Sequence, residues 1–186
     1  MLGLPASHDL ISADETDMSK ADPLYLPPTE ISRVDIPHEI STYLNGKDLA
    51  AKNVALQLST VDSDGWPHAA LLSAGEILVL PDGLIRLIIF PNSGTSNNIA
   101  RDGRSTLTMP LDRGMCQIRM QMRKLGESKA AGVALAVFEG HVQRIHKHLS
   151  RYADVESGLT FSLHEPEVVL DRWYRQIAVL RSLSPL

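Results

Sequence analysis

Apolar segments divided by turn residues run through the middle of the chain and constrain its fold more than any other feature. Gly, Asp, Asn or Pro residues separate most of these segments, and several segments alternate with the period of two that a half-buried strand requires. The predicted strands cover residues 53–61, 66–74, 76–80, 84–90, 104–109, 116–123, 133–146 and 159–163. Strands of this length, mostly joined by tight turns, favour a Greek-key or meandering barrel.

Two loops and one distortion are expected within this strand region. Loops are predicted at residues 110–114 and 126–132. In segment 133–146 the apolar positions change from odd to even numbers across Glu139-Gly140, which predicts a β-bulge or a sharp bend there. Asp62 and Asp64 lie in a predicted turn, so we expect these carboxylates to serve turn geometry and not acid–base catalysis.

Helices are expected to flank the strands at both ends of the chain. Helical spacing over residues 29–44 is interrupted by Pro37, so the first helix should begin near Pro37 and end at Asn45-Gly46. The last helix, residues 165–183, has Pro166 in its first turn and an apolar stripe formed by Val169, Trp173, Ile177 and Leu180. We therefore predict a mainly β fold with flanking helices, comprising a single domain at 29–186 and an extended or disordered N-terminal arm at 1–28.

The stretch Phe90–Gly103 (FPNSGTSNNIARDG) contains a further short helix and a candidate anion site. Ser93 lies where an N-cap is expected, and Gly103 lies where a left-handed C-cap is expected. Gly94 would let a ligand approach the backbone, and the free N–H groups and dipole of the first turn would favour a phosphate. An ordinary capped helix without a ligand explains the same residues, so the spacing alone leaves both interpretations open.

Composition excludes several classes of function. The 186-residue chain has a net charge of −4 and 5% aromatic residues, so it has neither the basic block nor the stacking surface of a nucleic-acid binder. The single cysteine, Cys116, excludes an intramolecular disulfide and a cysteine zinc site. No signal-peptide pattern and no apolar run of roughly 20 residues is present, so we expect a cytoplasmic protein that does not enter the membrane.

Two segments resemble the FMN-binding split-barrel family that pyridoxamine 5'-phosphate oxidase typifies. Residues Thr60–His68 (TVDSDGWPH) are similar to the family's T-x-D-x-D-G-x-P-H hairpin, and residues Ser93–Ile99 (SGTSNNI) are similar to its S-x-K/T-x-x-N-L/I segment. Arg101-Asp102-Gly103-Arg104 then follows in place of R-D/N-P-R, and the resemblance spans roughly residues 53–142. It implies a split β-barrel of Greek-key type and a homodimer with FMN at the subunit interface.

The resemblance also implies which residues contact the cofactor. By analogy Ser93 and Thr95 would bind the phosphate, Asn98 would support the turn, and the strand around Leu71 would lie against the flavin ring. Gln117, in CQIR, resembles the glutamine of the family's R-Q-V-R strand, which reaches the flavin from the partner chain. The complete set is Ala70, Leu71, Leu72, Ile89, Phe90, Ser93, Thr95, Asn98 and Gln117. No catalytic side chain is required, and His68 is a candidate proton donor that fits a surface histidine equally well.

The chain departs from the true oxidases in ways that change the expected activity. Thr95 stands where they carry lysine, Ala70 stands near the position of an arginine, and their C-terminal R-x-H has no match. Pyridoxamine 5'-phosphate oxidase activity is therefore not expected, and the charge for a phosphate would come from Arg101, Arg104 or Arg119. The resemblance still implies an FMN-dependent oxidoreductase acting on an unidentified small molecule. The alternative is a dimeric split-barrel ligand binder or stress-related protein whose flavin site has decayed.

Other clusters of reactive side chains are less informative. His146 and His148 place two imidazoles on one face of an extended segment, but no carboxylate or cysteine stands at ligand spacing, and we predict no metal site. A related barrel that uses haem or deazaflavin is a third hypothesis. Cys116 alternates with Ile118 and Met120, so it is expected in the core and not as a nucleophile.

Overall fold

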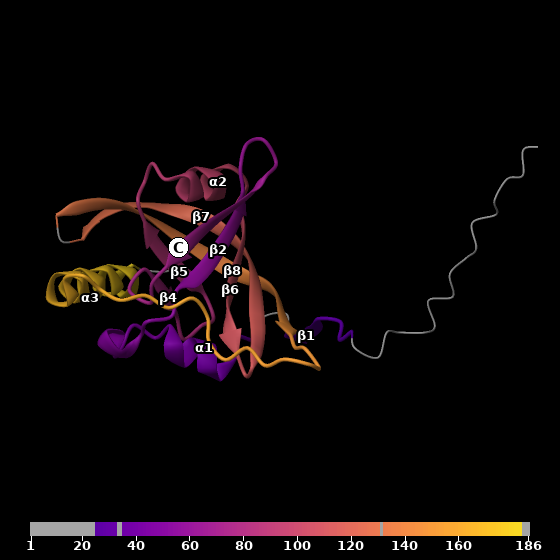
Figure 1. Ribbon diagram of the computed structural model, residues 1–186. Helices are drawn as coiled ribbons and strands as arrows, with labels where there is room; N and C mark the ends of the chain where they lie inside the picture. Colours follow the sequence, from indigo (N-terminus) through magenta and orange to yellow (C-terminus); the bar gives the residue numbers. More distant parts are fainter. Residues whose placement is uncertain (1–24, 33–34, 131, 184–186) are drawn as a thin grey trace, which may run out of the picture.

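An antiparallel sheet of eight strands forms the body of the protein (Figure 1). The structure is a computed structural model that describes residues 25–32, 35–130 and 132–183. The strands are β1 (Thr29–Ser32), β2 (Leu56–Val61), β3 (Pro67–Leu72), β4 (Ile77–Val79), β5 (Ile85–Ile89), β6 (Arg104–Leu111), β7 (Gly114–Ala130) and β8 (Val133–His148). The helices are α1 (His38–Tyr43), the 3₁₀ turn η1 (Leu49–Ala51), α2 (Gly94–Asp102) and α3 (Pro166–Ser182).

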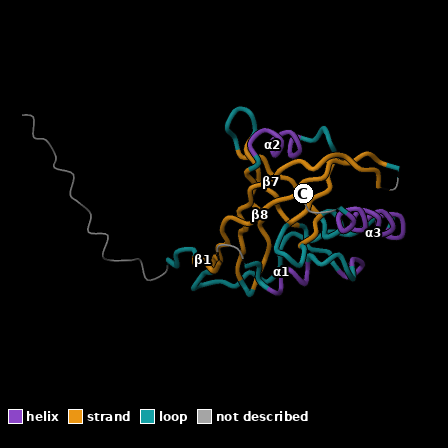
Figure 2. Tube along the Cα trace, turned by 180° about the vertical axis from the view of Figure 1, so that it is seen from behind, coloured by secondary structure: helices purple, strands orange, loops and turns teal. Residues whose placement is uncertain are grey.

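The strand order defines a split β-barrel. It runs β3-β2-β6-β7-β8-β5-β4, and β1 pairs with β8 outside this path. Every strand pair is antiparallel, and in the described part of the chain β3 and β4 end the order without pairing with each other. The predicted mainly β fold with flanking helices is thus confirmed. Figures 1 and 2 show α2 over one end of the sheet, α1 near the opposite end and α3 alongside.

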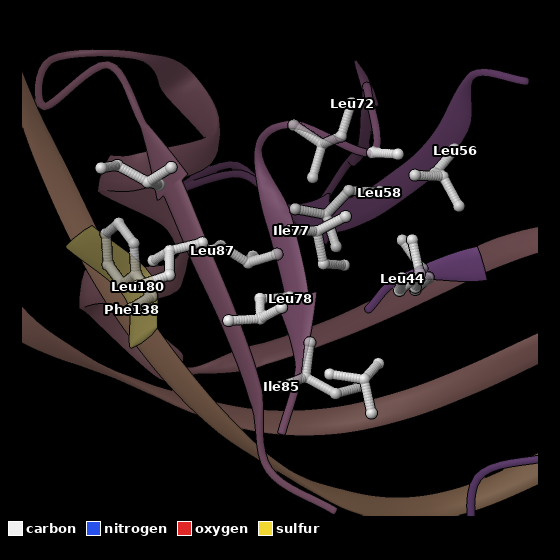
Figure 3. Close-up of a cluster of buried hydrophobic side chains, with 14 of the residues drawn as sticks. Leu44, Leu56, Leu58, Leu72, Ile77, Leu78, Ile85, Leu87, Phe138 and Leu180 are labelled. Carbon is white, nitrogen blue, oxygen red and sulfur yellow. The ribbon is translucent and has the colours of Figure 1, made fainter. Parts of the chain in front are cut away.

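Buried aliphatic side chains from the strands and from α3 fill the interior (Figure 3). The fully buried residues at its centre include Leu58, Ile77, Leu87, Phe138 and Leu180. Burying one such side chain contributes about 1.5–3 kcal/mol, so this cluster is the main source of stability. The stripe expected on α3 is confirmed, because Trp173, Ile177 and Leu180 are buried and Val169 is partly buried against the core.

Both predicted loops are shorter than expected. β6 continues to Leu111 and β7 begins at Gly114, so the loop predicted at 110–114 is a two-residue turn. Asp112 and Arg113 have φ values of 45° and 63°, which matches the two central residues of a type I′ hairpin turn. The loop predicted at 126–132 is also largely strand, because β7 extends to Ala130. Small and polar side chains are compatible with a strand here because most of this end of β7 is not buried.

The structure has no register shift at Gly140, where the sequence predicted a distortion of β8. Gly140 pairs in regular register with Met122 and Ile85, whereas the register shifts where Arg119 pairs with Arg144 and Met120 with Val142. Gln143 is therefore the extra residue of a β-bulge, and the buried face changes from Val142 to Ile145 across it. A second register shift lies on the β7 side, between Lys124 and Gly126 opposite Phe138 and Val137. The bulge at Gln143 changes the buried face from an even to an odd position, so it is not the odd-to-even change that the sequence predicted at Glu139-Gly140.

Two short segments differ from their predicted structure. Residues 29–32, expected within a region of helical spacing, form strand β1 because β8 offers them a backbone partner. Residues 159–163, expected as a strand, make one isolated bridge between Thr160 and Val54. The helix expected after Pro37 is α1, and the division into an arm and a domain remains a prediction because residues 1–24 lie outside the described part.

Candidate functional site

The two sequence motifs that resemble the split-barrel family lie against each other in the structure. Asn98 of α2 donates a hydrogen bond from Nδ2 to Thr60 Oγ1 of β2 at 3.0 Å. Arg101 donates to the backbone oxygens of Val61 and Asp62, which begin the β2–β3 turn. These contacts join segments more than thirty residues apart in the chain, so the spacing of the motifs reflects one structural unit.

The β2–β3 turn is built by its first aspartate. Asp62 Oδ1 accepts hydrogen bonds from the backbone N–H groups of Asp64 at 3.0 Å and Trp66 at 2.8 Å. Gly65 has a φ of 88°, which a residue without Cβ adopts readily. The prediction that Asp62 serves turn geometry is confirmed, and the turn leaves His68 on β3 facing α2.

Ser93 caps the start of α2, and two backbone N–H groups of the first turn remain without an acceptor inside the helix. Ser93 Oγ accepts from Ser96 N at 3.1 Å and donates to Phe90 O at 2.9 Å. Helix geometry gives the N–H groups of Gly94 and Thr95 no intrahelical acceptor. A Cβ placed on Gly94 would lie 3.2 Å from Cε1 and 3.3 Å from Nε2 of His68, so the imidazole lies directly over the first turn. His68 is thus at the expected phosphate end of the site, and not beside the expected ring.

The expected cofactor residues divide into an exposed and a buried group. Leu71 and Phe90 are each 58% exposed, whereas Leu72, Ile89, Thr95 and Asn98 are buried. Ala70 and Leu71 belong to β3, the last strand of the sheet order, so one side of their backbone has no strand partner among the described residues. Ser93, Thr95 and Phe90 lie at the start of α2, which contacts β3. The structure therefore brings all of the set except Gln117 to one edge of the barrel.

Gln117 contacts His148 within its own chain and does not lie with the other expected cofactor residues. Its Oε1 lies 3.1 Å from Nε2 of His148, and its position on β7 pairs with Thr108 and His146. A role in the cofactor site would require it to act from a second subunit. His146 and His148 belong to no group of three or more metal-ligating side chains among the described residues.

The three arginines expected to supply charge have different roles. Arg101 holds the β2–β3 turn, as described above. Arg104 pairs with Asp102 at 2.9 Å, and it lines a groove of about 480 Å³ together with Arg119. This groove lies on the outer side of β2, β6 and β7 and includes Ser59, Val61, Thr106 and Gln121, but none of the residues expected to bind the cofactor. His68, by contrast, lies against Gly94 in the first turn of α2.

A pocket of about 470 Å³ lies at the other end of β3. It is an open pocket lined by the end of β3, the segment that precedes α3 and the first turns of α3. Leu71 and Leu72 line it, so the strand expected to face a flavin ring does border a cavity. His68 and Leu72 are four residues apart, and a strand rises about 3.3 Å per residue, so α2 and this pocket are separated by about 13 Å along β3. The pocket-lining residues of α3 carry no recognised motif; Val169 and Trp173 were predicted as part of the apolar stripe, and no pattern in the sequence singles out Arg172.

Cys116 is fully buried, as predicted, and it should be chemically inert in the native protein. Burial raises the pKa of its thiol to about 11, against a smaller opposing effect of the Lys147 charge. At about pH 8 the reactive thiolate is therefore scarce. We expect an aromatic disulfide reagent to label the folded protein slowly and to label the protein unfolded in guanidinium chloride completely. Rapid stoichiometric labelling of the folded protein would contradict this buried position.

These features define the class of the protein: a split β-barrel with a candidate ligand site along the free edge of β3. Within that class, the chain is 35% identical to the uncharacterized protein YclD of Bacillus subtilis over 139 aligned residues. The aligned region covers 74% of this chain and 90% of YclD. The chain belongs to the family of YclD. No model of a described protein family matches it.

Solved structures with a similar course of the chain have low sequence identity. HupZ of Group A Streptococcus is 18% identical, with a TM-score of 0.49 over 65% of this chain and 99% of HupZ. Nitrilotriacetate monooxygenase component B of Bacillus cereus is 11% identical, with a TM-score of 0.44 over 67% of this chain and 83% of that protein. The styrene monooxygenase flavin reductase of Pseudomonas putida S12 is 8% identical, with a TM-score of 0.42 over 53% of this chain and 83% of the reductase. Likenesses this weak carry no functional conclusion for this chain.

Among the residues that the structure describes, no helix has the length and apolar character needed to cross a bilayer.

Proposed function

We propose that this protein binds FMN along the free edge of β3, as a homodimer, and acts as a flavin-dependent oxidoreductase on a small molecule. The observation that supports this most directly is the contact between the two family-like motifs, with His68 lying over the start of α2. In this arrangement the phosphate would lie at the N–H groups of Gly94 and Thr95, and the ring would lie near Leu71. A bound flavin would supply hydride or electron transfer.

The residues present suit the shape of FMN better than its charge. Free amides at a helix start and an unpaired strand edge fit a phosphate followed by a planar ring. Thr95, however, is buried at the position where the oxidases carry lysine, and Arg101 is engaged with backbone oxygens. His68 is therefore assigned as the side chain that supplements the helix dipole at the phosphate. Positive charge from a second subunit would add to it.

A dimer is proposed because the candidate site is open on one side. Trp66 is 71% exposed, and Leu71 and Phe90 are each 58% exposed, so three large apolar side chains border β3 and α2 without cover in one chain. A second copy would cover them and bring in Gln117 of the partner. Sedimentation at micromolar concentration tests this, and a monomer under those conditions would remove the shared site.

FMN titration tests the proposed function. We expect added FMN to lose fluorescence on binding and to raise the melting temperature of the protein. His68→Gln should lower the affinity for FMN about three- to tenfold, because a charge-assisted hydrogen bond to phosphate is lost. The same variant should leave the affinity for riboflavin unchanged, since riboflavin has the ring without the phosphate.

The matched control is His38→Gln, which changes a histidine on α1 at the opposite end of the molecule (Figure 1). It should leave FMN binding unchanged. Absence of both quenching and thermal shift at excess FMN would reject the proposal in favour of the second candidate, a dimeric small-ligand binder with a decayed flavin site. The missing lysine at Thr95 favours that second candidate, and a Soret band on haem titration would instead indicate a haem protein.

A further inference from the structure

The pocket between β3 and α3 has the size and lining of a small-molecule site. Its volume of about 470 Å³ falls in the range of roughly 300–1,000 Å³ that such sites occupy. Most of its wall is apolar, and the ring centroids of Phe161 and Trp173 lie 5.9 Å apart at an angle of 89°. A Cβ on Gly75 would lie 2.1 Å from Trp173 Cγ, so Trp173 packs directly on the backbone after β3. This wall is therefore held by close packing.

Arg172, which lines the pocket, makes no hydrogen bond or ion pair with the described residues. The Nε atom of Arg172 is buried and lacks a hydrogen bond, and Arg172 takes part in no ion pair with any residue of the described chain. Its neighbour along the helix, Arg175, differs in this respect, because it pairs with Asp171 at 2.9 Å and is largely exposed. Arg172 as a whole is partly exposed, but its buried Nε–H lacks an acceptor, and this costs free energy that a bound hydrogen-bond acceptor would offset.

The pocket also has acidic side chains, and these restrict the class of ligand. Glu76 Oε2 accepts from the backbone N–H and the hydroxyl of Ser73, each at 2.8 Å, while Oε1 has no hydrogen bond within the described chain. Glu165 and the exposed His164 lie at the rim. Two carboxylates would repel an anion. A neutral group that offers a carbonyl oxygen to Arg172 and an N–H to Glu76 satisfies both side chains.

We propose that this pocket binds a planar, mostly apolar heterocycle that presents an amide-type carbonyl and N–H to Arg172 and Glu76. Two sources have this chemistry. One is the pyrimidine edge of a flavin whose ring lies against Leu71, and this source rests on the proposed function. The other is a separate substrate with an amide on an aromatic ring, and this source depends on the pocket alone.

Riboflavin and nicotinamide are the probes that distinguish the sources. Riboflavin binding is followed by its own fluorescence. Nicotinamide binding is followed by the fluorescence of Trp173 in a Trp66→Phe background, because Trp66 and Trp173 are the two tryptophans of the chain. We expect Arg172→Gln to weaken at least one probe about tenfold, since a hydrogen bond to a charged group is lost. Arg175→Gln, one turn further along α3, should change neither affinity by more than about twofold.

Arg172→Lys is a control that separates a loss of ligand contacts from a loss of the fold. It keeps the positive charge but loses the planar fork of donors, and it should give an affinity between those of the wild type and Arg172→Gln. The melting temperature of each variant, measured without ligand, shows whether the fold is kept.

Each outcome of these titrations is decisive. Weakened riboflavin binding assigns the pocket to the flavin ring, and weakened nicotinamide binding assigns it to a separate substrate. Unchanged affinity for both probes in folded Arg172→Gln and Arg172→Lys, or no binding of either probe to the wild type, would overturn the proposal. Tight FMN binding together with unchanged probe affinities rejects this inference and leaves the proposed function standing. Nicotinamide binding that Arg172→Gln weakens, together with no FMN binding, supports this inference and rejects the proposed function.

Discussion

Replacing Arg86 with leucine is expected to lower the free energy of unfolding by about 3–5 kcal/mol. Arg86 is 1% exposed on β5, and its guanidinium forms an ion pair with Glu139 of β8 at 2.8 Å. Its NH1 group also donates to the backbone oxygens of Leu180 and Leu183, each at 2.7 Å. One side chain therefore neutralises a buried carboxylate and caps the C-terminal end of α3.

The loss of stability is large because Arg86→Leu leaves buried polar groups without their hydrogen-bond partners. Glu139 is 2% exposed and would keep one partner, Arg123, whose side chain is 47% exposed. The last carbonyl groups of α3 would also lose their buried donor, and unpaired helix-end carbonyls are costly away from water. α3 packs on the core through Leu180, so loosening this end also weakens the apolar contacts.

Urea denaturation followed by circular dichroism measures this effect. Arg123→Leu, which removes the exposed partner of the same carboxylate, serves as the control and should cost roughly 1 kcal/mol. The double variant Arg86→Leu/Glu139→Leu should be more stable than Arg86→Leu alone, because no uncompensated charge remains buried. If Arg86→Leu were as stable as Arg123→Leu, the buried ion pair would have no such role.

The same pair predicts how stability depends on pH. Burial by itself raises the pKa of Glu139, but the hydrogen bonds and charges of Arg123 and Arg86 outweigh it and hold the pKa below the ordinary value of 4.5. A carboxyl group with a lowered folded-state pKa contributes stability above its unfolded-state pKa and loses that contribution as the pH falls through the folded-state pKa. The acid-side loss of stability should therefore be shallower in Arg86→Leu than in the wild type.

Gly103→Ala should destabilise the protein by about 2–4 kcal/mol, the second-largest effect expected. Gly103 has a φ of 76° at the C-cap of α2, which costs a residue with a Cβ about 1–2 kcal/mol. A Cβ there would also lie 2.5 Å from the backbone oxygen of Met122 and 2.2 Å from Gln121 Nε2. The backbone cannot move aside easily, because Gly103 O accepts from Met122 N at 2.7 Å.

Gly83→Ala is the matched control for this prediction. Gly83 has a similar φ of 84°, but a Cβ there would meet no atom within 4 Å. Its substitution reports the backbone strain alone, so the difference between the two variants reports the crowding between α2 and β7. Because Gly103 fixes α2 on the sheet, Gly103→Ala should also weaken FMN binding, whereas Gly83→Ala should not. Equal unfolding free energies in the two variants would show that this contact is not tight.

Local patterns in the sequence were sufficient for most of the fold. The alternation of Cys116, Ile118 and Met120 predicts one buried face of β7 because a strand places successive side chains on opposite sides. The stripe on α3 predicts its packed face for the equivalent reason at a period of 3.6 residues. The two motifs that resemble one family correspond to the β2–β3 hairpin and to α2, but the contact between them was not predicted.

Tertiary structure alone decided the features that join distant segments. β1 is a strand because β8 offers it a partner, and a bulge lies at Gln143 because β7 and β8 shift register there, as they do again beside Leu125. Arg172 reaches the β3 pocket from a helix about a hundred residues away in the chain, and Arg86 reaches the end of that same helix. The sequence by itself determined where side chains would be buried, because burial leaves a local period. Which buried groups meet depends on long-range packing, and packing leaves no local trace.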